Sequence, residues 1–431
     1  MVQGFAGVLP VSTLAIILPV LEFELARASV ARVLPTKSIT MSERHPAVSM
    51  ADSRPLIAPG QSLMLGSWSG PSVMTGVPNT ESLRSPYRRC RGVHMAASPK
   101  GTIALSGGRV IPASDLSVAV YGGGSFGTAM ACVLARKGIP AKLVVRRQEV
   151  VDQINTNHVN PYYQSDLLLP PLLRATVDPE EAFASADFIF HAVPMQFSRK
   201  ALEDVKHLIR DDVPVVSLTK GIETSTLCLM SDLIPDVLGS GQPVAFVSGP
   251  SFAAEIVNGM ATAVTVASAD RDLANDVMAL FKSASFRALY TPDVVGVEVG
   301  GAVKNVIAIA AGMSEGLGLG TNAMAALVTR GCGEMRRLVT TLGGGSSTVF
   351  GLSGVGDTFG TCFGPLSRNR QVGYRLGKGE KLEDILESMS QVAEGVATAR
   401  ALTQLVNKRV KGYRKDLKYV RPFSCSHHLC H

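Results

Sequence analysis

The chain has 431 residues, which is long enough for two or three domains. Its formal net charge of +7 lies at the ends, because residues 1–114 and 408–431 each carry a net charge of +6 and the segment between them carries −5. A nucleic-acid-binding core would present a basic face, so this mildly acidic middle argues against that class of protein. The seven cysteines form no C-x-x-C pair, which favours free thiols in a reducing compartment; they stand at positions 90, 132, 228, 332, 362, 425 and 430.

Residues 1–114 do not read as a fold, and we expect a targeting or disordered extension there. Their composition, rich in Ser, Pro, Arg and Gly and poor in acidic residues, is typical of an organelle transit segment. The early stretch FAGVLPVSTLAIILPVLEF resembles the apolar region of a secretory signal. Pro10 and Pro19 interrupt it and no basic residue precedes it, so we expect no membrane span.

A signal followed by a transit peptide, as in plastids entered through the secretory route, would account for both parts of the extension. Cleavage is then expected after YRRCRGVHMAAS, and the location would be the plastid (chloroplast) stroma. The alternative is an extension that is not translated, since Met41, Met50 and Met95 could each start a shorter chain. Without a transit segment, the expected location is the cytoplasm.

The first chemical motif is VAVYGGGSFGTAMACVLARKG, residues 118–138. An apolar run of strand type is followed by a glycine-rich turn, in which Gly122, Gly124 and Gly127 fit the pattern G-x-G-x-x-G. The next apolar residues have helical spacing, so the turn opens a helix whose N-terminal N–H groups attract anions. The motif predicts a dinucleotide-binding turn; the alternative is an ordinary turn between a strand and a helix.

The second predicted strand ends in two basic residues, Arg146 and Arg147, where an acidic residue would hold the ribose of NAD. Two guanidinium groups suit a ribose 2′-phosphate, which favours NADP over NAD. The alternative is that one arginine stacks on the adenine and the other is solvated.

Short apolar runs alternate with amphipathic segments up to about residue 290, which indicates a mostly parallel, doubly wound sheet. The strand candidates are residues 118–121, 141–145, 187–192, 213–218, 243–247 and 262–268. From about residue 294 no convincing strand remains and long helical segments follow. We therefore predict an α/β Rossmann-type N-terminal domain over residues 115–295, an all-α substrate and catalytic domain over 296–407, and an atypical basic tail over 408–431.

Two lysines stand where chemistry is expected. Lys220, in VSLTKGIE, follows a predicted strand at the edge where ligands bind in open α/β sheets; the alternative is a solvated loop charge. Lys304 and Asn305 are the only polar side chains of VGGAVKNVIAIAAGM, residues 299–313. Burial there would lower the pKa of Lys304 toward neutrality and suit acid–base catalysis, unless the side chain reaches the surface.

A glycine-rich segment, residues 351–373, contains Asp357 and then the cluster Ser367, Arg368, Asn369 and Arg370. Arginine with serine and asparagine can bind a phosphate dianion through several charge-assisted hydrogen bonds. The alternative is a solvated basic loop, which the nearby glycines disfavour because they signal close backbone approach.

In order along residues 117–407, eight motifs resemble the NAD(P)-dependent glycerol-3-phosphate dehydrogenase family of the bacterial and plastid type. They are GGGSFGT, HAVPMQ, SLTKGIE, SGPSFAAE, GVEVGGAVKNVIAIAAG, GLSGVGD, LSRNR and QVAEGVATA. The resemblance implies reversible hydride transfer between C2 of sn-glycerol 3-phosphate and NAD(P)+, giving dihydroxyacetone phosphate for use in glycerolipid metabolism. It also implies NAD(P)H as the cofactor, a small-molecule substrate and a homodimer.

The resemblance assigns residues by motif. Lys304 would exchange the proton of the C2 hydroxyl, Lys220 would contact substrate and cofactor, and Asp357 would orient Lys304. The substrate site would comprise Lys220, Gly249, Ser251, Lys304, Asp357, Ser367, Arg368 and Asn369, the last three around the phosphate. The cofactor would contact Gly122, Gly124, Ser125, Phe126, Gly127, Arg146, Arg147, Lys220, Ala253, Arg368, Val392 and Glu394.

After ARALTQLVNK the resemblance stops, and the tail that follows shows no helical periodicity. The helical domain is therefore expected to be incomplete. The terminal CSHHLCH could chelate a metal, but a structural zinc site needs ligands held tetrahedrally, so we expect no metal. Two other functions stay open: a 3-hydroxy-acid dehydrogenase of the same architecture, and an inactive cofactor-binding protein with a loosened cleft.

Overall fold

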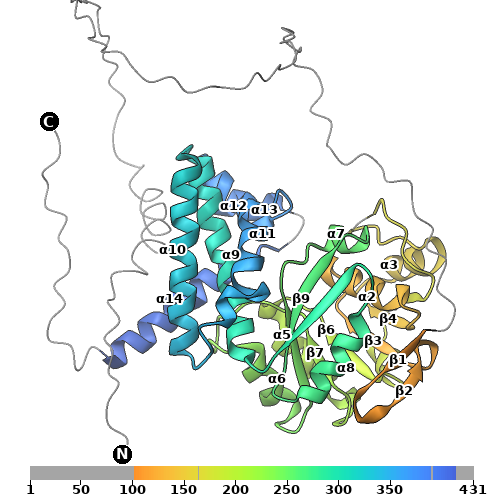
Figure 1. Cartoon of the computed structure of the whole chain (residues 1–431). Helices are drawn as coiled ribbons and strands as arrows, with labels where there is room; N and C mark the ends of the chain where they lie inside the picture. The colour runs from red at the N-terminus through yellow and green to blue at the C-terminus, as the bar shows by residue number, and fades with distance from the viewer. Residues whose placement is uncertain (1–100, 164, 390–391, 414–431) are drawn as a thin grey trace, which may run out of the picture. The chain divides into compact units, whose positions relative to one another are not determined.

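The computed structural model describes residues 101–163, 165–389 and 392–413, the last five of them by their backbone alone. Within these residues an eight-stranded sheet with flanking helices comes first, and a group of helices follows it (Figure 1). The expected fold class, a Rossmann-type domain followed by a helical domain, is therefore confirmed. The predicted extension before residue 101 and the tail after 413 lie outside the described residues.

The sheet has the strand order β10-β9-β8-β7-β6-β3-β4-β5. All neighbouring strands are parallel except β8 and β9, which are antiparallel, so β9 and β10 run opposite to the other six. The strands are β3 (Val118–Tyr121), β4 (Ala141–Val144), β5 (Leu173–Thr176), β6 (Phe188–His191), β7 (Val215–Ser217), β8 (Val244–Ser248), β9 (Thr262–Ala267) and β10 (Phe286–Thr291).

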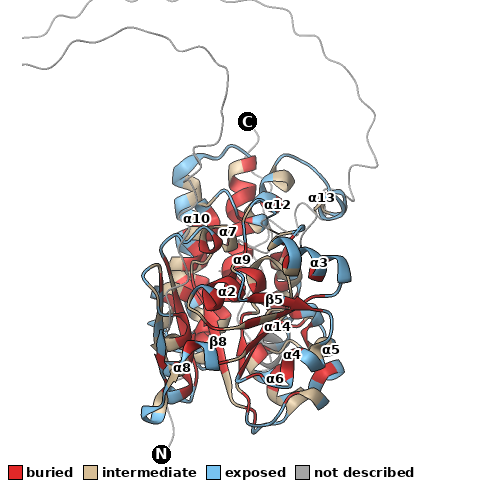
Figure 2. Cartoon of the chain, turned by 90° about the vertical axis from the view of Figure 1, so that its right-hand side faces the viewer, coloured by how far each residue is buried: buried red, intermediate tan, exposed pale blue. Residues whose placement is uncertain are grey.

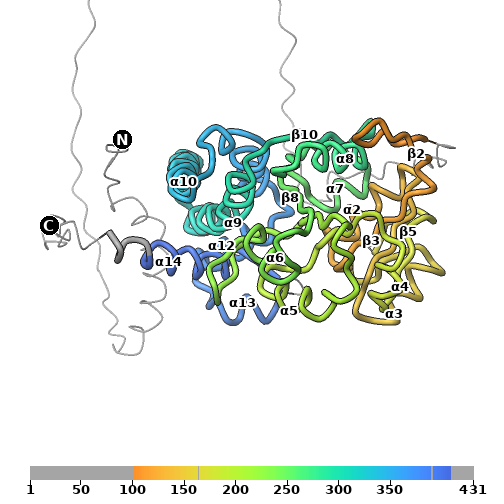
Figure 3. Tube along the Cα trace, turned by 90° about the horizontal axis from the view of Figure 1, so that it is seen from below, coloured from red at the N-terminus to blue at the C-terminus, as the bar shows by residue number. Residues whose placement is uncertain are grey.

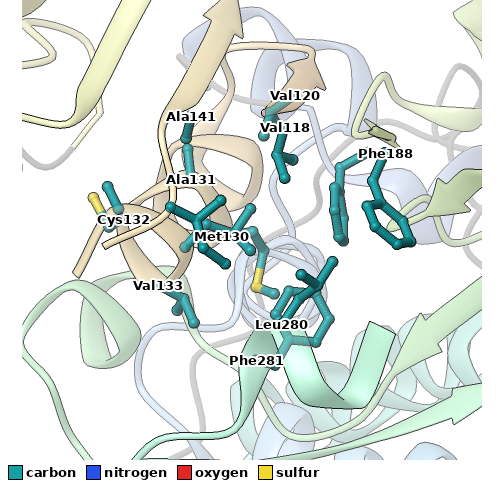
Figure 4. Close-up of a cluster of buried hydrophobic side chains, with 14 of the residues drawn as sticks. Val118, Val120, Met130, Ala131, Cys132, Val133, Ala141, Phe188, Leu280 and Phe281 are labelled. Carbon is teal, nitrogen blue, oxygen red and sulfur yellow. The ribbon is translucent and has the colours of Figure 1, made fainter. Parts of the chain in front are cut away.

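Helices on both faces bury the central strands, which explains why β3 and β6 read as continuous apolar runs. The helices are α2 (Ser125–Arg136), α3 (Gln148–Asp152), α4 (Pro179–Phe183), α5 (Met195–Val205), α6 (Met230–Leu238), α7 (Ala253–Val257) and α8 (Arg271–Phe281). Short helical turns cover Ser106–Gly108, Ala113–Asp115, Gln153–Asn157 and Lys206–Leu208. In Figure 4, Val118, Met130, Phe188 and Phe281 meet in one apolar cluster, so β3, α2, β6 and α8 share a core.

The helical part is built on α9 (Val294–Gly316), which is buried over most of its length (Figure 2). Helices α10 (Gly320–Thr341), α12 (Arg368–Gly377) and α14 (Glu394–Tyr413) pack against it (Figure 3), as do α11 (Asp357–Phe363) and the helical turns at Thr348–Phe350 and Leu352–Gly356. Helix α13 (Leu382–Ser388) packs on α12. Of the described helices only α9 is long and apolar enough to cross a membrane, but 83% of its most apolar window is buried inside the protein. It is therefore the core helix of this part.

Glycines bring α12 into backbone contact with α9. A Cβ atom added at Gly373 would lie 1.9 Å from the carbonyl oxygen of Ile309, and one at Gly312 would lie 2.0 Å from that of Arg370. Side chains at these positions would force the helices apart. The absence of side chains at these glycines therefore explains how α12, which begins at Arg368, packs directly against the helix that carries Lys304.

Three features differ from the sequence prediction. Residues 101–114, assigned to the extension, instead form a hairpin of β1 (Thr102–Ala104) and β2 (Val110–Pro112) that buries Ile103 and Leu105 in the core. Strands β5 and β10 were not predicted, because each lies at a sheet edge and mixes buried and exposed positions. Helix α14 continues to Tyr413, past the predicted end of helical periodicity at 408, since this stretch holds helix-forming Lys and Arg and no proline before Pro422.

Candidate active site

Two lysines and one aspartate meet where the sheet domain contacts the helices. The Lys304 ammonium donates hydrogen bonds to Asp357 Oδ1 and to Thr361 Oγ1, each at 2.8 Å. The Lys220 ammonium donates to Asp357 Oδ2 at 2.8 Å and to the Gly249 carbonyl at 3.5 Å. Lys304 and Asp357 are buried, at 8% and 3% exposure, so both lysines share a carboxylate that is shielded from water.

Two adjacent glycines of α9 make this meeting possible. A Cβ atom at Gly301 would lie 2.7 Å from Ser248 Oγ and 3.5 Å from Cγ of Lys220. A Cβ atom at Gly300 would lie 2.8 Å from the carbonyl oxygen of Ser353, four residues before Asp357. The glycine pair therefore lets the end of β8, the Lys220 stem and the turn before α11 approach the helix that carries Lys304.

The environment shifts the pKa values of Lys304 and Asp357. Burial lowers the pKa of Lys304 from 10.5 to about 8, with a contribution from the Lys220 ammonium, while Asp357 opposes the shift. Burial alone would raise the pKa of the Asp357 carboxyl, but the two ammonium groups outweigh it and hold that pKa below its usual value. Lys304 is thus an ammonium close to its titration point beside a fixed negative charge, a state suited to proton transfer.

The glycine turn between β3 and α2 fits a pyrophosphate. Gly122 has φ +118°, and a Cβ atom there would lie 2.8 Å from the Ala192 backbone. A Cβ atom at Gly127 would lie 2.0 Å from the Gly122 carbonyl oxygen, so the helix packs tightly on the turn. A Cβ atom at Gly124 would face open space, and Gly124 offers no side chain at the start of α2. The helix start is thus open to an anion.

Ser125 and Phe126 extend the turn toward the lysines. Both are partly buried in the first turn of α2. The Lys220 ammonium lies over the Phe126 ring, 5.8 Å from its centroid. The glycine turn and the two lysines are therefore neighbours in the fold.

Arg146 and Arg147 follow β4 and are exposed, as expected for groups that face a ligand or solvent. The Arg147 guanidinium lies over the Tyr162 ring at 4.7 Å and is 3.4 Å from Glu149 Oε1. The Tyr162 hydroxyl donates to the same carboxylate oxygen at 2.5 Å. Arg147 is thus held between an aromatic ring and an acid, and the contact with Tyr162 was not predicted from the sequence.

The loop between β8 and α7 contributes Gly249, Ser251 and Ala253. Gly249 has φ +154°, and a Cβ atom there would lie 2.9 Å from Cα of Val264, so only glycine fits. The Ser251 hydroxyl donates to the Gly249 carbonyl at 2.8 Å, beside the Lys220 ammonium. Ala253 is the first residue of α7 and packs against the apolar core of the sheet domain.

The predicted phosphate residues gather at the start of α12. The buried Ser367 hydroxyl accepts the Arg370 N–H at 3.2 Å as the helix cap. Arg368 donates to the Val392 carbonyl at 3.0 Å and is otherwise exposed. The Asn369 side chain is already hydrogen-bonded within the protein. Its amide nitrogen donates to Asn305 Oδ1 at 2.9 Å, and its oxygen accepts the Gly395 N–H at 3.0 Å. One amide N–H of Asn369 is left for a phosphate.

Glu394 begins α14 and reaches across to α5. The Met195 N–H at the start of α5 favours the charged form of its carboxylate. Burial raises the pKa of the Glu394 carboxyl, against the effect of Arg368, Lys220 and Lys304. Glu394 and Val392 line a small recess together with Pro194, Met195, Gln196, Phe197, Ala397 and Thr398, which places them beside the end of β6.

Two residues of the cluster were not predicted. Thr361 lies one helical turn after Asp357, accepts from Lys304, and donates to the Asp357 carbonyl at 2.6 Å. Asn305 follows Lys304 and holds Asn369. Thr361 could have been predicted from the sequence, because it stands four residues after Asp357 on the same helix and so on the same helix face.

Within the described residues, no group of three His, Cys, Asp or Glu side chains could hold a metal ion. The CSHHLCH segment considered for chelation lies outside them. The open glycine turn, the exposed arginines and the two lysines beside Asp357 fit a dinucleotide and an anionic substrate.

Comparison with known proteins identifies the family. The family model described as NAD-dependent glycerol-3-phosphate dehydrogenase N-terminus matches residues 117–274, and its C-terminus counterpart matches residues 293–417. The chain belongs to the NAD-dependent glycerol-3-phosphate dehydrogenase family. The second match extends past residue 408, where the sequence resemblance was expected to stop.

Relatives and solved structures agree with this family. Chloroplastic glycerol-3-phosphate dehydrogenase [NAD(+)] 2 of Arabidopsis thaliana is 50% identical over 294 residues, 68% of this chain and 70% of the relative. Glycerol-3-phosphate dehydrogenase [NAD(P)+] of Nitratidesulfovibrio vulgaris is 49% identical over 68% of this chain and 89% of the relative. The structure of the Coxiella burnetii glycerol-3-phosphate dehydrogenase is 36% identical with a TM-score of 0.66, over 68% of this chain and 90% of that one.

Proposed function

We propose that the protein is an NAD(P)-dependent glycerol-3-phosphate dehydrogenase that interconverts sn-glycerol 3-phosphate and dihydroxyacetone phosphate. The observation that carries the proposal is the buried contact of Lys304 with Asp357, next to Lys220. It supplies a proton donor with a pKa of about 8 at the end of a dinucleotide-binding sheet. The names of the relatives in plants and bacteria support the same reaction.

Bound NADH or NADPH would supply the hydride that adds to C2 of the ketone. Lys304 gives its proton to the C2 oxygen in reduction and takes it back in oxidation. An ammonium has three N–H donors; Asp357 and Thr361 occupy two of those of Lys304, so the third is free to reach the substrate oxygen. Asp357 keeps the lysine in this orientation and stabilises its charged form.

The substrate phosphate would lie at the start of α12. The exposed Arg368 guanidinium, the Ser367 hydroxyl and the remaining Asn369 N–H face this region, and the helix N-terminus itself favours an anion. Lys220 would hold the substrate oxygens closer to the reacting carbon. The 3-hydroxy-acid alternative would offer only a singly charged carboxylate to this cluster, so a cluster that suits a phosphate dianion favours the phosphorylated substrate.

The cofactor would lie along the glycine turn, with Gly122, Gly124, Ser125, Phe126 and Gly127 around its pyrophosphate. Arg146 and Arg147 would meet the adenosine end, and Ala253, Val392 and Glu394 would approach from the other side. The two arginines favour NADPH, although relatives carry the names NAD(+) and NAD(P)+.

The remaining proposals concern the whole molecule. We propose a homodimer, as implied by the family, and a plastid location. Chloroplastic relatives support the plastid location. Bacterial relatives are almost as similar to this chain, and they are compatible with the alternative location in the cytoplasm. Size-exclusion chromatography with light scattering and a C-terminal fluorescent fusion of the full chain test these two points.

One assay tests the function. Purified protein is mixed with dihydroxyacetone phosphate and NADPH or NADH, and cofactor oxidation is followed by absorbance. We expect turnover in the parent and a loss of at least about a hundredfold in Lys304→Ala, with cofactor binding nearly unchanged, because one acid–base group is removed. No turnover with this ketone, or turnover only with a 3-oxo acid, contradicts the proposal, and a Lys304→Ala rate within a few-fold of the parent removes Lys304 from the mechanism.

A further inference from the structure

The loop that carries Lys220 is fastened to α5 by an amide. Gln196, in the first turn of α5, donates from Nε2 to the Ile222 carbonyl at 2.7 Å. Its Oε1 accepts from the Thr224 N–H at 3.0 Å and from the Thr224 hydroxyl at 2.7 Å. One side chain thus fixes the backbone two and four residues after Lys220.

An ion pair fastens the same loop one helical turn further along α5. Arg199 donates from Nε to Glu223 Oε1 at 3.0 Å and from Nη2 to Oε2 at 3.1 Å, a two-point contact. The Glu223 side chain is 6% exposed and also accepts the Thr226 hydroxyl. Burial alone would raise the pKa of the Glu223 carboxyl, but Arg199 and Thr226 lower it below its usual value, so the carboxylate is charged at neutral pH.

The fastened backbone leaves Lys220 little freedom. Gly221 has φ +124°, and a Cβ atom there would lie 3.2 Å from Cβ of Met195, so the chain turns tightly against the start of α5 directly after Lys220. A lysine side chain has four rotatable carbon–carbon bonds, and a loose backbone would add more freedom. Holding the loop therefore keeps the Lys220 ammonium within 2.8 Å of Asp357 at a smaller entropic cost.

We propose that Gln196, Arg199 and Glu223 form a clamp that positions Lys220 for the substrate. They are positioning residues, because they touch the Lys220 loop and act on the substrate only through Lys220. The inference rests on the proposed function, in which Lys220 holds the substrate. It adds a task for motif residues, Gln196 in HAVPMQ and Glu223 in SLTKGIE, beyond the predicted site.

The test is a double-mutant cycle between Glu223→Gln and Lys220→Met, with kcat/KM for dihydroxyacetone phosphate as the readout. Glu223→Gln keeps the shape of the side chain and removes its charge. Asp236→Asn is the matched control, because Asp236 accepts from the same Arg199 at 2.5 Å but stands on α6 and its side chain is 64% exposed. Enzyme concentrations are raised for the Lys220→Met background so that its slower rate stays measurable.

We expect Glu223→Gln to lower kcat/KM about tenfold in the parent but less than twofold when Lys220 is already Met, whereas Asp236→Asn changes it less than twofold in both. If Glu223→Gln lowers kcat/KM equally in both backgrounds, Glu223 serves the fold and the clamp is overturned. The clamp is also overturned if Glu223→Gln has the kcat/KM of the parent. If Glu223→Gln does not fold, Gln196→Met takes its place under the same two criteria, and failure of both to fold also overturns the clamp. An inactive parent overturns the proposed function as well, whereas an active parent with equal losses overturns the clamp alone.

Discussion

Lys304 changes its charge close to physiological pH because it is buried. Its pKa, lowered to about 8 by burial and by Lys220, lies well below the 10.5 of a solvated lysine. Below about pH 8 the group is the acid that reduction of the ketone requires. Above that pH it is the neutral amine that oxidation of the alcohol requires.

The two directions of the reaction should therefore depend on pH with opposite signs. We expect kcat/KM for dihydroxyacetone phosphate to fall as the pH rises through about 8, and kcat/KM for glycerol 3-phosphate to rise through the same value. Both are measured from pH 7 to 10, where a phosphate monoester with a second pKa of about 6 is already a dianion. Profiles that move in the same direction, or an inflection near 10.5, would exclude Lys304 as the titrating group.

Arg146 and Arg147 should select the cofactor. Replacing both by Ala should weaken NADPH binding about tenfold or more and NADH binding much less, because only NADPH has the 2′-phosphate that a guanidinium binds. Fluorescence titration of the two cofactors measures this. Tyr162→Leu serves as a second variant, since it removes the ring under Arg147 and leaves the charge in place. Equal losses for NADPH and NADH would indicate adenine stacking instead.

Arg368 should act through the substrate phosphate. Arg368→Ala should lower kcat/KM for dihydroxyacetone phosphate by about 3 kcal/mol of transition-state binding, the scale for one partner of a charged pair in a closed site. Unphosphorylated dihydroxyacetone lacks the group that Arg368 would hold, so its poor turnover should change little. The efficiency ratio of the two ketones in parent and variant is the measurement. If both ketones lose equally, Arg368 serves the cofactor or the fold, and Lys220 becomes the next candidate.

Sequence reasoning reaches some of these residues and not others. An isolated lysine on an apolar helix predicts Lys304, because few other roles justify burying an ammonium. The residues around Asn369 in the sequence could not predict that its side chain forms hydrogen bonds with Asn305 and Gly395. That arrangement depends on how α9, α12 and α14 pack, which is decided by contacts between segments far apart in the sequence.

At the scale of elements, glycine decides how close α12 comes to α9. Gly373→Ala would place a Cβ atom 1.9 Å from the Ile309 carbonyl oxygen, and the backbone cannot yield as a side chain would. We expect a destabilisation of about 2 kcal/mol or more by thermal unfolding, with a lower kcat/KM because α12 carries Arg368.

Gly333→Ala is the matched control for Gly373→Ala. Gly333 lies inside α10, and a Cβ atom there would meet nothing within 4 Å. Alanine favours helix over glycine by about 1 kcal/mol, so this variant should be neutral or stabilised. Equal losses in the two variants would mean that helix contact at Gly373 is not the cause.

The same scale explains which elements the sequence predicts. Strands β3 and β6 are buried on both faces and appear as apolar runs, so their positions were predicted within a residue. Strands β5 and β10 lie at the two edges of the sheet, where one side has no neighbouring strand and the residues need not be uniformly apolar. Burial therefore sets the strength of the sequence signal.

For the whole molecule, the site exists only where separate parts of the chain meet. Lys220 follows β7, Gly249 follows β8, Lys304 lies on α9 and Asp357 on α11, so the folded core has to bring four segments together. The motifs predict each participant, but the shared carboxylate of Asp357 is a property of the assembled fold. Stability of the core and precision of the site are therefore linked for residues that pack against α9.

The hairpin of β1 and β2 belongs to the stability of the molecule and not to its chemistry. It packs on α8, where Asp276 accepts both the N–H and the hydroxyl of Ser106, at 2.5 and 2.9 Å.

Ile103 is 2% exposed, so Ile103→Ala should destabilise the fold by about 2–5 kcal/mol, the range for removing most of a buried aliphatic side chain. Val110→Ala, in the same hairpin but at a residue 63% exposed, should change stability by less than about 0.5 kcal/mol. Chemical denaturation of the full chain measures both, and kcat/KM below the unfolding transition should stay within twofold of the parent. An Ile103→Ala variant as stable as the parent would show that the hairpin is not part of the core, and a selective loss of activity would place it near the site.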